Sequence, residues 1–392
     1  MFATLRSPRN PLLRLGAIVS ALWLAACEPM PGTLGGGPGI DTKAAVPVAL
    51  LVPAGSGNAG DETLAKSLRQ AAQLAISDLN GVKIDLRVYN TGGGPDQAAA
   101  MANKAVDEGA KIILGPVFAE SANAAGLAVA DRGVNVLSFS NSTDIAGGNV
   151  FVLGPSFPNT ANRLASYAAS QGKRRILVVQ DQNLEGEIGA KAIQAAIGRS
   201  GATLAGIASY PFSQQGVVDA MPAIAGRVKA GDVDALFLTA NTAGALPLLA
   251  QMLPDSGVNP AQTKFIGLTR WDIPPATLAL PGLQGGWFAL PDPSLNNRFR
   301  ERYQAAFGEA PHPVAGLAYD GIAAIGALVK SGRSDALTKA ALTQPSGFVG
   351  VNGIFRLRPD GTNERGLAVA EIRNGQVVVI DAAPRSFGMA GF

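Results

Sequence analysis

The sequence predicts an α/β protein of two Rossmann-like lobes with mostly parallel sheets and a central cleft. From Val46 onwards, short β-branched runs alternate with Ala-rich helical segments, a pattern typical of βαβ units. The alternation breaks near residues 151–157 and then resumes, giving two βα series that each close an open sheet. The 392 residues, 47% hydrophobic and 16% charged, have a globular composition and suffice for two or three domains. Open α/β sheets bind ligands at the carboxyl ends of their strands, so we expect a binding cleft there.

The elements follow from hydrophobic periodicity and from turn residues. Strands are expected at Val46–Val52, Lys83–Tyr89, Lys111–Leu114, Val134–Leu137, Arg175–Gln180, Thr203–Tyr210, Ala235–Thr239, Lys264–Gly267 and Gln284–Ala289. Helices are expected at Glu62–Asn80, Asp96–Gly109, Ala119–Asp131, Asn159–Gln171, Glu185–Ser200, Val217–Lys229, Gly244–Leu253, Asn296–Phe307 and Val314–Ser331. Asp61 is the expected N-cap of the first helix. From Phe348 to Ile380 the Asp360-Gly361 and Asn374-Gly375 pairs predict antiparallel hairpins.

The N-terminal segment reads as a targeting signal. Three arginines within residues 1–14 precede an uncharged apolar run, Leu15 to Ala26, which is too short to cross a membrane. The run ends in Leu-Ala-Ala-Cys27 and resembles bacterial lipoprotein signals, which implies cleavage after residue 26 and lipidation of Cys27. Glu28, in place of the Asp that retains lipoproteins in the inner membrane, favours the outer membrane. Residues 27–43 are rich in Gly and Pro and are expected to form a tether.

The composition excludes several classes of chemistry. One Cys and one His cannot build a His/Cys zinc centre, and no nucleophile elbow, triad or metal cluster is present, so we expect no enzyme, no cofactor and no metal. Removing the three signal-peptide arginines takes the net charge from +3 to about zero, which argues against nucleic-acid binding. Gly55 to Gly60 spell GxGxxG, but a secreted domain does not retain nicotinamide cofactors. This loop is expected to offer backbone N–H groups to a small anion or to be a flexible turn.

Four stretches of the chain carry a family resemblance. They are VPVALLVPAGSGNAGDETLAKSLRQAAQLAISDLNGVKIDLRVYNTGGGPDQAAAMANKAV, GAKIILGPVFAESANAAGLAVADRGVNVLSF, RRILVVQDQNLEGEIGAKAI and GLAYDGIAAIGAL. Their order resembles type 1 periplasmic binding proteins, in particular the leucine/isoleucine/valine-binding group. In that family the chain crosses between the lobes three times. The resemblance implies an N-lobe of residues 44–155 plus 285–345 and a C-lobe of residues 156–284 plus 346–392.

The resemblance also implies ligand contacts in the N-lobe. The loop after the strand at 111–114 corresponds to one that offers a hydroxyl and backbone amides to a ligand carboxylate, and Ser121 is its nearest hydroxyl. The loop at 137–143 matches the family segment that holds the ligand's α-groups, with Ser140 and Ser142 at the contacting positions. Ser/Asn-rich turns also cap helices, so a purely structural role for this loop stays open.

In the C-lobe the sequence departs from the family pattern. Glu185 and Asn241 stand where the family has tyrosines that cover a bound amino acid. Thr269 stands where the family has the acid that pairs with the ligand ammonium, and Arg270 is beside it. An unpaired buried ammonium costs several kcal/mol, so Asp272 or Glu185 would have to supply the charge, or an acidic ligand would use Arg270.

Two functions therefore remain open. The first is a non-catalytic substrate-binding lipoprotein of an ABC transporter for amino acids or similar small molecules, lipid-anchored on the periplasmic side of the envelope with a permease as partner. The alternative is an outer-membrane lipoprotein activator of a penicillin-binding peptidoglycan synthase, which uses the same fold with a degraded ligand site. The residues at 185, 241 and 269 favour the alternative, whereas the hydroxyl-rich loop at 138–143 favours transport.

Overall fold

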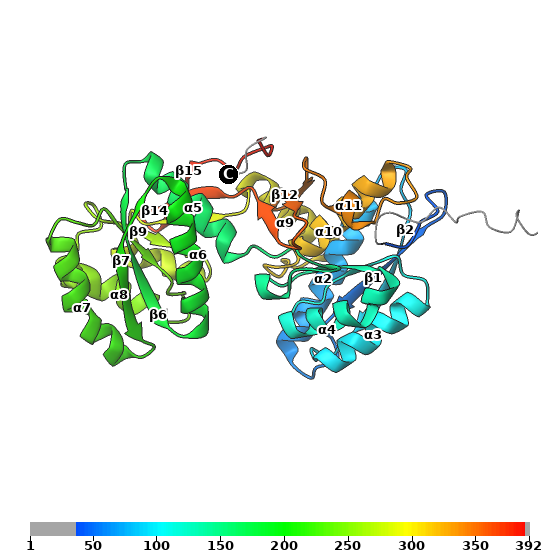
Figure 1. The fold of residues 1–392 in the computed structure, drawn as a ribbon, viewed down its shortest axis with the longest axis horizontal. Coiled ribbons are helices and arrows are strands. Elements are labelled where there is room, and N and C mark those ends of the chain that lie inside the picture. Colours follow the sequence, from blue (N-terminus) through cyan, green and yellow to red (C-terminus); the bar gives the residue numbers. More distant parts are fainter. Residues whose placement is uncertain (1–36, 389–392) are drawn as a thin grey trace, which may run out of the picture.

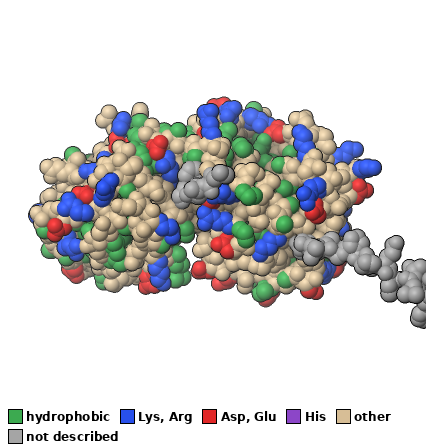
Figure 2. Space-filling view, turned by 45° about the horizontal axis from the view of Figure 1, so that its top comes forward, with side chains coloured by type: hydrophobic (Ala, Val, Ile, Leu, Met, Phe, Trp, Pro, Cys, Tyr) green, Lys and Arg blue, Asp and Glu red, His purple; other side chains and the backbone are tan. Residues whose placement is uncertain are grey.

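The computed structural model describes residues 37–388, which form two α/β lobes side by side (Figure 1; space-filling view in Figure 2). The first lobe holds a five-stranded sheet and the second a seven-stranded sheet. The predicted two-lobed α/β architecture is confirmed. Cys27 and the signal segment before it lie outside the described residues.

The first sheet has the strand order β2-β1-β3-β4-β5, and all of its strands are parallel. Its strands are β1 (Val46–Val52), β2 (Ile84–Asn90), β3 (Ile112–Leu114), β4 (Asn135–Ser138) and β5 (Val150–Val152). The helices of this lobe are α2 (Ala59–Ser77), α3 (Pro95–Asp107), α4 (Ala119–Val129), α9 (Pro293–Phe307), α10 (Gly316–Lys330) and α11 (Lys339–Leu342). The strand β5 was not expected from the sequence, and α2 is capped by Asn58 rather than by Asp61.

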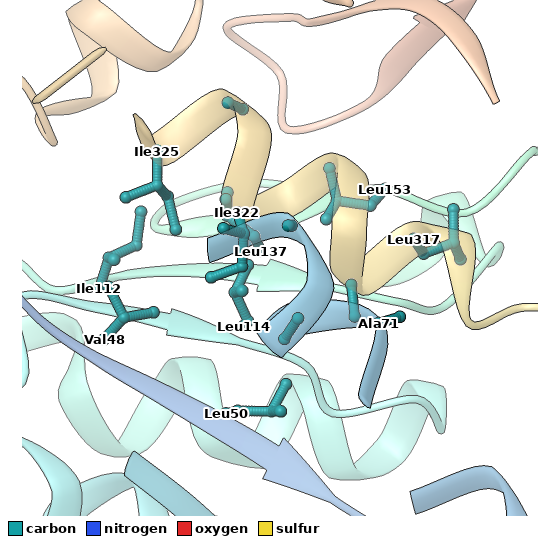
Figure 3. Close-up of a cluster of buried hydrophobic side chains, with 14 of the residues drawn as sticks. Val48, Leu50, Ala71, Ile112, Leu114, Leu137, Leu153, Leu317, Ile322 and Ile325 are labelled. Atoms are coloured by element: carbon teal, nitrogen blue, oxygen red, sulfur yellow. The ribbon is translucent and has the colours of Figure 1, made fainter. Parts of the chain in front are cut away.

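Both faces of this sheet are covered by helices, which explains why β1 is apolar throughout. Successive side chains of a strand point to opposite faces. Val48 and Leu50 pack against α2 and α10, where Ile322 and Ile325 are fully buried (Figure 3). The helices α3 and α4 cover the opposite face with small alanine side chains.

The second sheet has the order β15-β14-β10-β9-β8-β6-β7, and only β14 runs antiparallel to the other strands, pairing with β10 on one side and β15 on the other. Its strands are β6 (Arg175–Gln182), β7 (Thr203–Pro211), β8 (Ala235–Leu238), β9 (Lys264–Gly267), β10 (Trp287–Leu290), β14 (Ala368–Arg373) and β15 (Gln376–Asp381). The helices are α5 (Phe157–Ser170), α6 (Leu184–Ser200), α7 (Gln214–Lys229) and α8 (Leu246–Asp255). The first two pack on one face of the sheet and the last two on the other.

A third, antiparallel sheet of β11 (Phe348–Gly350), β12 (Gly353–Leu357) and β13 (Asn363–Arg365) packs against α10. Phe348 and Phe355 belong to the core of the first lobe. A buried ion pair between Arg365 and Asp320 on α10, 3.0 Å apart, attaches the end of this sheet to that lobe.

The chain passes between the lobes after β5, after β10 and after β13. Sheet membership differs from the expected lobe boundaries at two points. The strand β10 was expected in the first lobe, but it is hydrogen-bonded to β9 and β14 of the second. The small sheet was expected in the second lobe, but it packs on the first, because its aromatic side chains complete the core beneath α10.

Candidate functional site

Strand ends of both sheets meet in a pocket of about 260 Å³ between the lobes, which we call the cleft pocket. One wall is the loop after β4, residues 141–144 of the first lobe. The other wall is the start of α6 in the second lobe, with Leu184, Glu185 and Ile188, and the start of α5 closes the end. The predicted site residues Ser142 and Glu185, 43 positions apart in sequence, thus line one cavity.

The serine-rich loop after β4 is held mainly by its own hydroxyls. Ser138 donates its hydroxyl to the Pro116 carbonyl at 3.0 Å and accepts the backbone N–H of Ser140 at 3.1 Å. The hydroxyl of Ser140 in turn accepts the N–H of Ser142 at 3.1 Å. Ser140 is therefore turned inward and is 5% exposed, whereas Ser142 is half-buried and lines the cleft pocket.

Ser121 also turns inward. It lies in the first turns of α4, is 1% exposed and donates its hydroxyl to the Gly93 carbonyl at 3.2 Å. This hydrogen bond joins α4 to the loop between β2 and α3. The structure thus uses the hydroxyls of Ser121 and Ser140 within the first lobe, and neither residue lines the cleft pocket.

The predicted residues of the second lobe lie on neighbouring strand ends. Asn241 donates its amide to Glu185 at 3.1 Å across the top of β6 and β8. Because Leu238 pairs with Gly267, Asn241 and Thr269 follow adjacent strands. The side-chain oxygens of Asn241 and Thr269 are buried and have no hydrogen-bond partner among the described residues. Buried acceptors of this kind call for a donor, which a bound ligand or a water molecule supplies.

Arg270 and Asp272 pair with each other. The Nε atom of Arg270 donates to Asp272 at 2.8 Å, and a second contact joins the same two side chains. The pair faces α9 and the loop with His312 in a second interlobe pocket of about 260 Å³. The sequence allowed Asp272 to meet a ligand ammonium or Arg270 to meet an acidic ligand. In the structure each of these side chains neutralises the other.

A buried polar cluster beneath Glu185 was missed by the sequence analysis. The carboxyl of Asp181, at the end of β6, accepts the hydroxyl of Tyr210, and the backbone N–H of Asp181 donates to Thr239 at 3.0 Å. Burial raises the pKa of Asp181, and this effect exceeds the opposite effect of its hydrogen bonds to Tyr210 and Thr239. The cluster joins the ends of β6, β7 and β8 and sets the floor of the second lobe's side of the cleft. The only sequence signal for it was an acid at a strand end.

The Gly55 to Gly60 loop uses much of its hydrogen-bonding capacity internally. The N–H of Gly55 donates to Glu62 at 2.6 Å, and Asn58 caps α2 by accepting the N–H of Gly60 at 2.8 Å. Within residues 37–388, no group of three or more His, Cys, Asp or Glu side chains is arranged to hold a metal ion. In the same part of the chain, every helix is too short or too polar to span a bilayer.

Comparison with known proteins identifies the family to which this fold belongs. The family model for periplasmic binding proteins matches residues 45–376. The chain belongs to the periplasmic binding protein family. No curated protein matches this periplasmic binding protein by sequence.

Solved structures of the same fold cover most of this periplasmic binding protein at low identity. A branched-chain amino acid ABC transporter periplasmic ligand-binding protein from Burkholderia xenovorans is 18% identical over 88% of this chain and 95% of its own, with a TM-score of 0.68. An ABC transporter substrate-binding protein from Desulfitobacterium hafniense in complex with Leu is 19% identical over 86% and 100%, with a TM-score of 0.63. A solute-binding protein of an ABC transporter from R. palustris in complex with benzoate is 17% identical over 89% and 99%, with a TM-score of 0.57.

Exposed apolar side chains border the cleft of this periplasmic binding protein and were not predicted. Phe118 lies on the loop after β3, Leu184 at the start of α6, Phe212 after β7 and Ile273 after β9. Their exposed fractions are 39%, 74%, 55% and 40%. These loops follow the carboxyl ends of parallel strands, the edge at which open α/β sheets bind ligands. Of the four side chains, Leu184 lines the cleft pocket and Ile273 lines the pocket of Arg270 and Asp272. Glu185 and Asn241, which stand where the resemblance implies tyrosines, are polar, and neighbouring loops supply apolar surface instead.

Proposed function

We propose that this chain is the non-catalytic substrate-binding component of an ABC transporter and that it takes an amino acid or a similar small molecule between its lobes. The cleft pocket carries the proposal, because its walls come from both lobes and join the predicted residues Ser142 and Glu185. A ligand held on two lobes favours their closure, and the closed form is the signal to a permease. The solved relatives named in complex with Leu and with benzoate support a small ligand.

The polar groups of the cleft favour a ligand that has both N–H or O–H donors and an apolar body. The unpartnered oxygens of Asn241 and Thr269 can accept hydrogen bonds, and Leu184 and Ile188 of the cleft pocket offer apolar surface. Glu185 contacts the neutral amide of Asn241 and no cation among the described residues. It is the carboxylate that we assign to a ligand ammonium, in place of the acid that the family has at position 269.

The location we propose is the periplasmic side of the cell envelope, with a lipid anchor at Cys27. The arginines, the apolar run and the Leu-Ala-Ala-Cys sequence support this assignment, and Glu28 favours the outer membrane. A single acyl chain binds a membrane reversibly, so stable anchoring depends on the several chains of a lipoprotein.

The second candidate is an activator of a penicillin-binding peptidoglycan synthase. The mutual neutralisation of Arg270 and Asp272 favours it, because neither member of this pair then offers its charge to a ligand. The hydroxyls of Ser121 and Ser140 also favour this candidate, because both are turned inward and form hydrogen bonds within the first lobe.

A thermal-shift screen of the purified chain against amino acids, small organic acids and muropeptide fragments separates the two candidates. At about one hundred times its dissociation constant, a ligand stabilises the native state by about 2.7 kcal/mol and raises the melting temperature by several degrees. Ser142→Tyr and Glu185→Gln should abolish the shift, whereas Ser166→Tyr, on an exposed position of α5, should retain it. A chain that responds to none of the compounds but retains a peptidoglycan synthase in a pull-down would contradict the transport proposal.

A further inference from the structure

A further cavity of about 310 Å³, distinct from the cleft pocket and from the pocket of Arg270 and Asp272, lies at the hinge between the first and third crossings of the chain. We call it the hinge pocket. Its walls come from both lobes: Arg358 and Thr362 belong to the small sheet of the first lobe, and Asn162, Arg163 and Asp381 belong to the second. Its volume is within the range of small-molecule sites.

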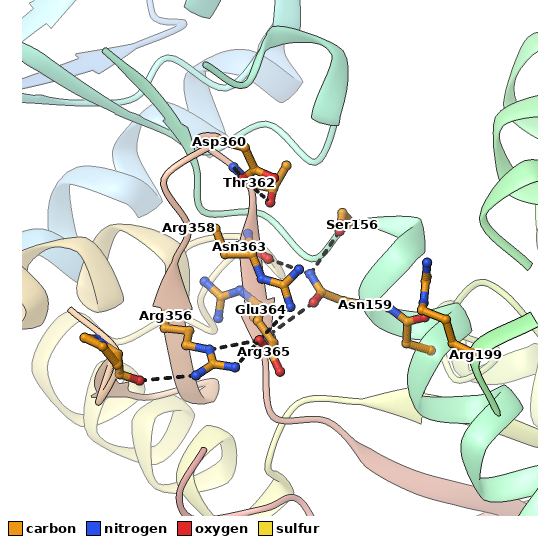
Figure 4. A network of polar contacts seen from close by, with 12 residues as sticks. Ser156, Asn159, Arg199, Arg356, Arg358, Asp360, Thr362, Asn363, Glu364 and Arg365 are labelled. Carbon is orange, nitrogen blue, oxygen red and sulfur yellow. Dashed lines mark hydrogen bonds and ion pairs between the residues drawn. The ribbon is translucent and has the colours of Figure 1, made fainter. Parts of the chain in front are cut away.

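The hinge pocket is electropositive. Three guanidinium groups, those of Arg163, Arg358 and Arg365, line it together with two carboxylates, those of Glu364 and Asp381. Behind this lining Asp320 pairs with Arg365 and Arg356 pairs with Glu364, so four arginines face three carboxylates and one positive charge is in excess. Figure 4 shows the arginines of the small sheet gathered around Glu364 and facing Asn159 of α5. Burial alone would raise the pKa of Glu364, but hydrogen bonds from Arg358 and from Arg356 outside the pocket bring it below its ordinary value. Glu364 is therefore ionised and already occupied.

All three arginines of the pocket keep donors that the protein does not use, and for Arg365 this donor is its buried Nη2. Arg163 donates through Nε to the Leu367 carbonyl at 2.7 Å and through Nη2 to Asp381 at 2.8 Å, and its Nη1 has no acceptor among the described residues. Arg358 donates through Nη2 to Glu364 at 2.7 Å, and its Nε and Nη1 have no acceptor in that part of the chain. Planar guanidinium groups with free donors bind carboxylates and phosphates in two-point geometry.

The start of α5 adds to this field. Its N-cap Ser156 lines the pocket but makes no capping hydrogen bond with its side chain. Pro158 has no N–H, and the N–H groups of Asn159 and Thr160 donate to the Ser156 carbonyl, so the helix contributes through its dipole, which favours an anion at its start as the arginines do. The side-chain oxygen of Asn162 accepts a hydrogen bond from the guanidinium of Arg199 at 2.7 Å, which leaves the amide N–H₂ group of Asn162 for a ligand.

The hinge pocket adjoins the cleft pocket. Two residues line both cavities: Thr143 of the first lobe and Pro158 of the second. Since each cavity has walls from both lobes, a rotation of the lobes changes the shape of both.

We propose that the hinge pocket is a second ligand site, which takes a small organic anion with a carboxylate or a phosphate group and thereby shifts the balance between open and closed lobes. An anion that fits one lobe arrangement better stabilises that arrangement, and the effect on the cleft ligand is reciprocal. This site is independent of the function proposed for the cleft and exists whether the chain serves a permease or a synthase.

Calorimetric titration of the full chain with inorganic phosphate and with glucuronate tests the site. Phosphate presents the anion alone, and glucuronate presents a carboxylate on a body rich in hydroxyls. We expect saturable binding of at least one probe, with a dissociation constant of about 1 mM or lower. Saturation by phosphate alone assigns a phosphate ligand, and saturation by glucuronate alone assigns a sugar acid.

Arg358→Gln and Asn162→Ala should each weaken that binding about tenfold or more. Arg358 is nearly half exposed and Glu364 keeps Arg356, so the first variant retains the fold. The matched control is Arg333→Gln, which removes the same charge from an exposed pair with Asp335 outside the pocket and should bind like the parent. Absence of saturable heat with both probes, or equal binding by both pocket variants and the parent, overturns the site.

Small-angle scattering of the full chain with the better probe tests the coupling. The radius of gyration should change on saturation, and the change should vanish in Arg358→Gln. Saturable binding with an unchanged radius of gyration would overturn the coupling to lobe motion and leave a passive site.

Discussion

At the scale of single residues, hydrogen bonding to the backbone decides which polar side chains face the cleft. Ser140 and Ser142 are two positions apart, yet the first is buried in its own loop and the second lines the cleft pocket. The pattern of hydroxyls predicted the right loop, because turn-forming Ser and Asn residues follow strand ends in either case. It did not predict the direction of each hydroxyl, because that depends on acceptors such as the Pro116 carbonyl, which come from elsewhere in the chain.

Asp181 supplies a prediction of pH dependence. Burial raises its pKa above the ordinary value of 3.8, so the folded protein binds a proton more tightly at this site than the unfolded chain does. The stability contributed by the protonated carboxyl is therefore present below pH 3.8 and is lost as the pH rises through the folded pKa. Asp181→Asn keeps the shape and removes the titration. Its free energy of unfolding relative to the parent should rise between about pH 4 and about pH 7 in denaturant titrations.

The control for this prediction is Asp335→Asn. This carboxyl is exposed, and its partner Arg333 lowers its pKa below the ordinary value of 3.8, so the relative stability of that variant should fall as the pH rises towards about 4 and should not rise between about pH 4 and about pH 7. A difference between Asp181→Asn and the parent that stays constant with pH would contradict an effect of burial on this carboxyl.

At the scale of elements, two successive strand-to-helix connections of the second lobe, β6 to α6 and β7 to α7, are built in the same way. Asn183 and Ser213 cap α6 and α7 by accepting the N–H of Gly186 and Gly216. Both glycines lie against the carbonyl of the preceding strand end, where an added Cβ would approach the Asp181 oxygen to 2.1 Å and the Pro211 oxygen to 2.3 Å. Glycine is required there because the helix begins in contact with the strand it follows.

Gly186→Ala should therefore destabilise the protein by about 1–3 kcal/mol, since the backbone of β6 or α6 has to move. Gly198, in the same helix α6, is exposed and has no atom within 4 Å of an added Cβ. Gly198→Ala should instead stabilise it by about 0.5–1 kcal/mol, because alanine loses less backbone entropy in a helix. Thermal unfolding of both variants checks the pair, and equal effects would show that the contact with Asp181 is unimportant.

Most elements could be predicted from the sequence because their signals are local. The strand β1 matches its expected bounds, and the hairpin turns at Asp360-Gly361 and Asn374-Gly375 connect the expected strands. The strand β5 was missed because three residues between turns give no periodicity. The lobe that receives β10 was not predictable from its own residues, since its pairing with β9 and β14 depends on distant strands.

At the scale of the whole molecule, the first and third crossings are fastened to each other by polar side chains. Asn363, at the third crossing, donates to the carbonyls of Val152 and Gly154 at 2.7 and 2.8 Å, both at the first crossing. Asn159 donates to Asn363 at 2.5 Å. The side-chain oxygen of Asn159 also accepts the backbone N–H of Arg365 at 3.2 Å. These contacts join the small sheet to the start of α5, and so join one lobe to the other.

Asn363→Ala should lower the free energy of unfolding by about 3 kcal/mol, because it removes the donor to two backbone carbonyls and leaves the Asn159 amide with Ser156 as its one remaining partner among the contacts described. The heat-capacity peak in calorimetry should also broaden or split, since the lobes are then less tightly joined. Asn297→Ala, on the exposed surface of α9, serves as the control and should unfold like the parent. An unchanged peak in Asn363→Ala would show that the crossings are fastened by other contacts.

The late position of β11 to β14 in the chain sets the order in which the protein can fold as it is made. The first strand of the first lobe begins at residue 46, but α10 ends only at Lys330 and the small sheet only at Arg365. The first lobe is therefore incomplete until residues near 365 are available. The second lobe lacks β14, so β10 keeps an open edge until almost the last residues. An exposed strand edge is a site for pairing with other chains. A product cut short before residue 348 would have neither lobe complete, and its fate would be aggregation or proteolysis rather than partial function.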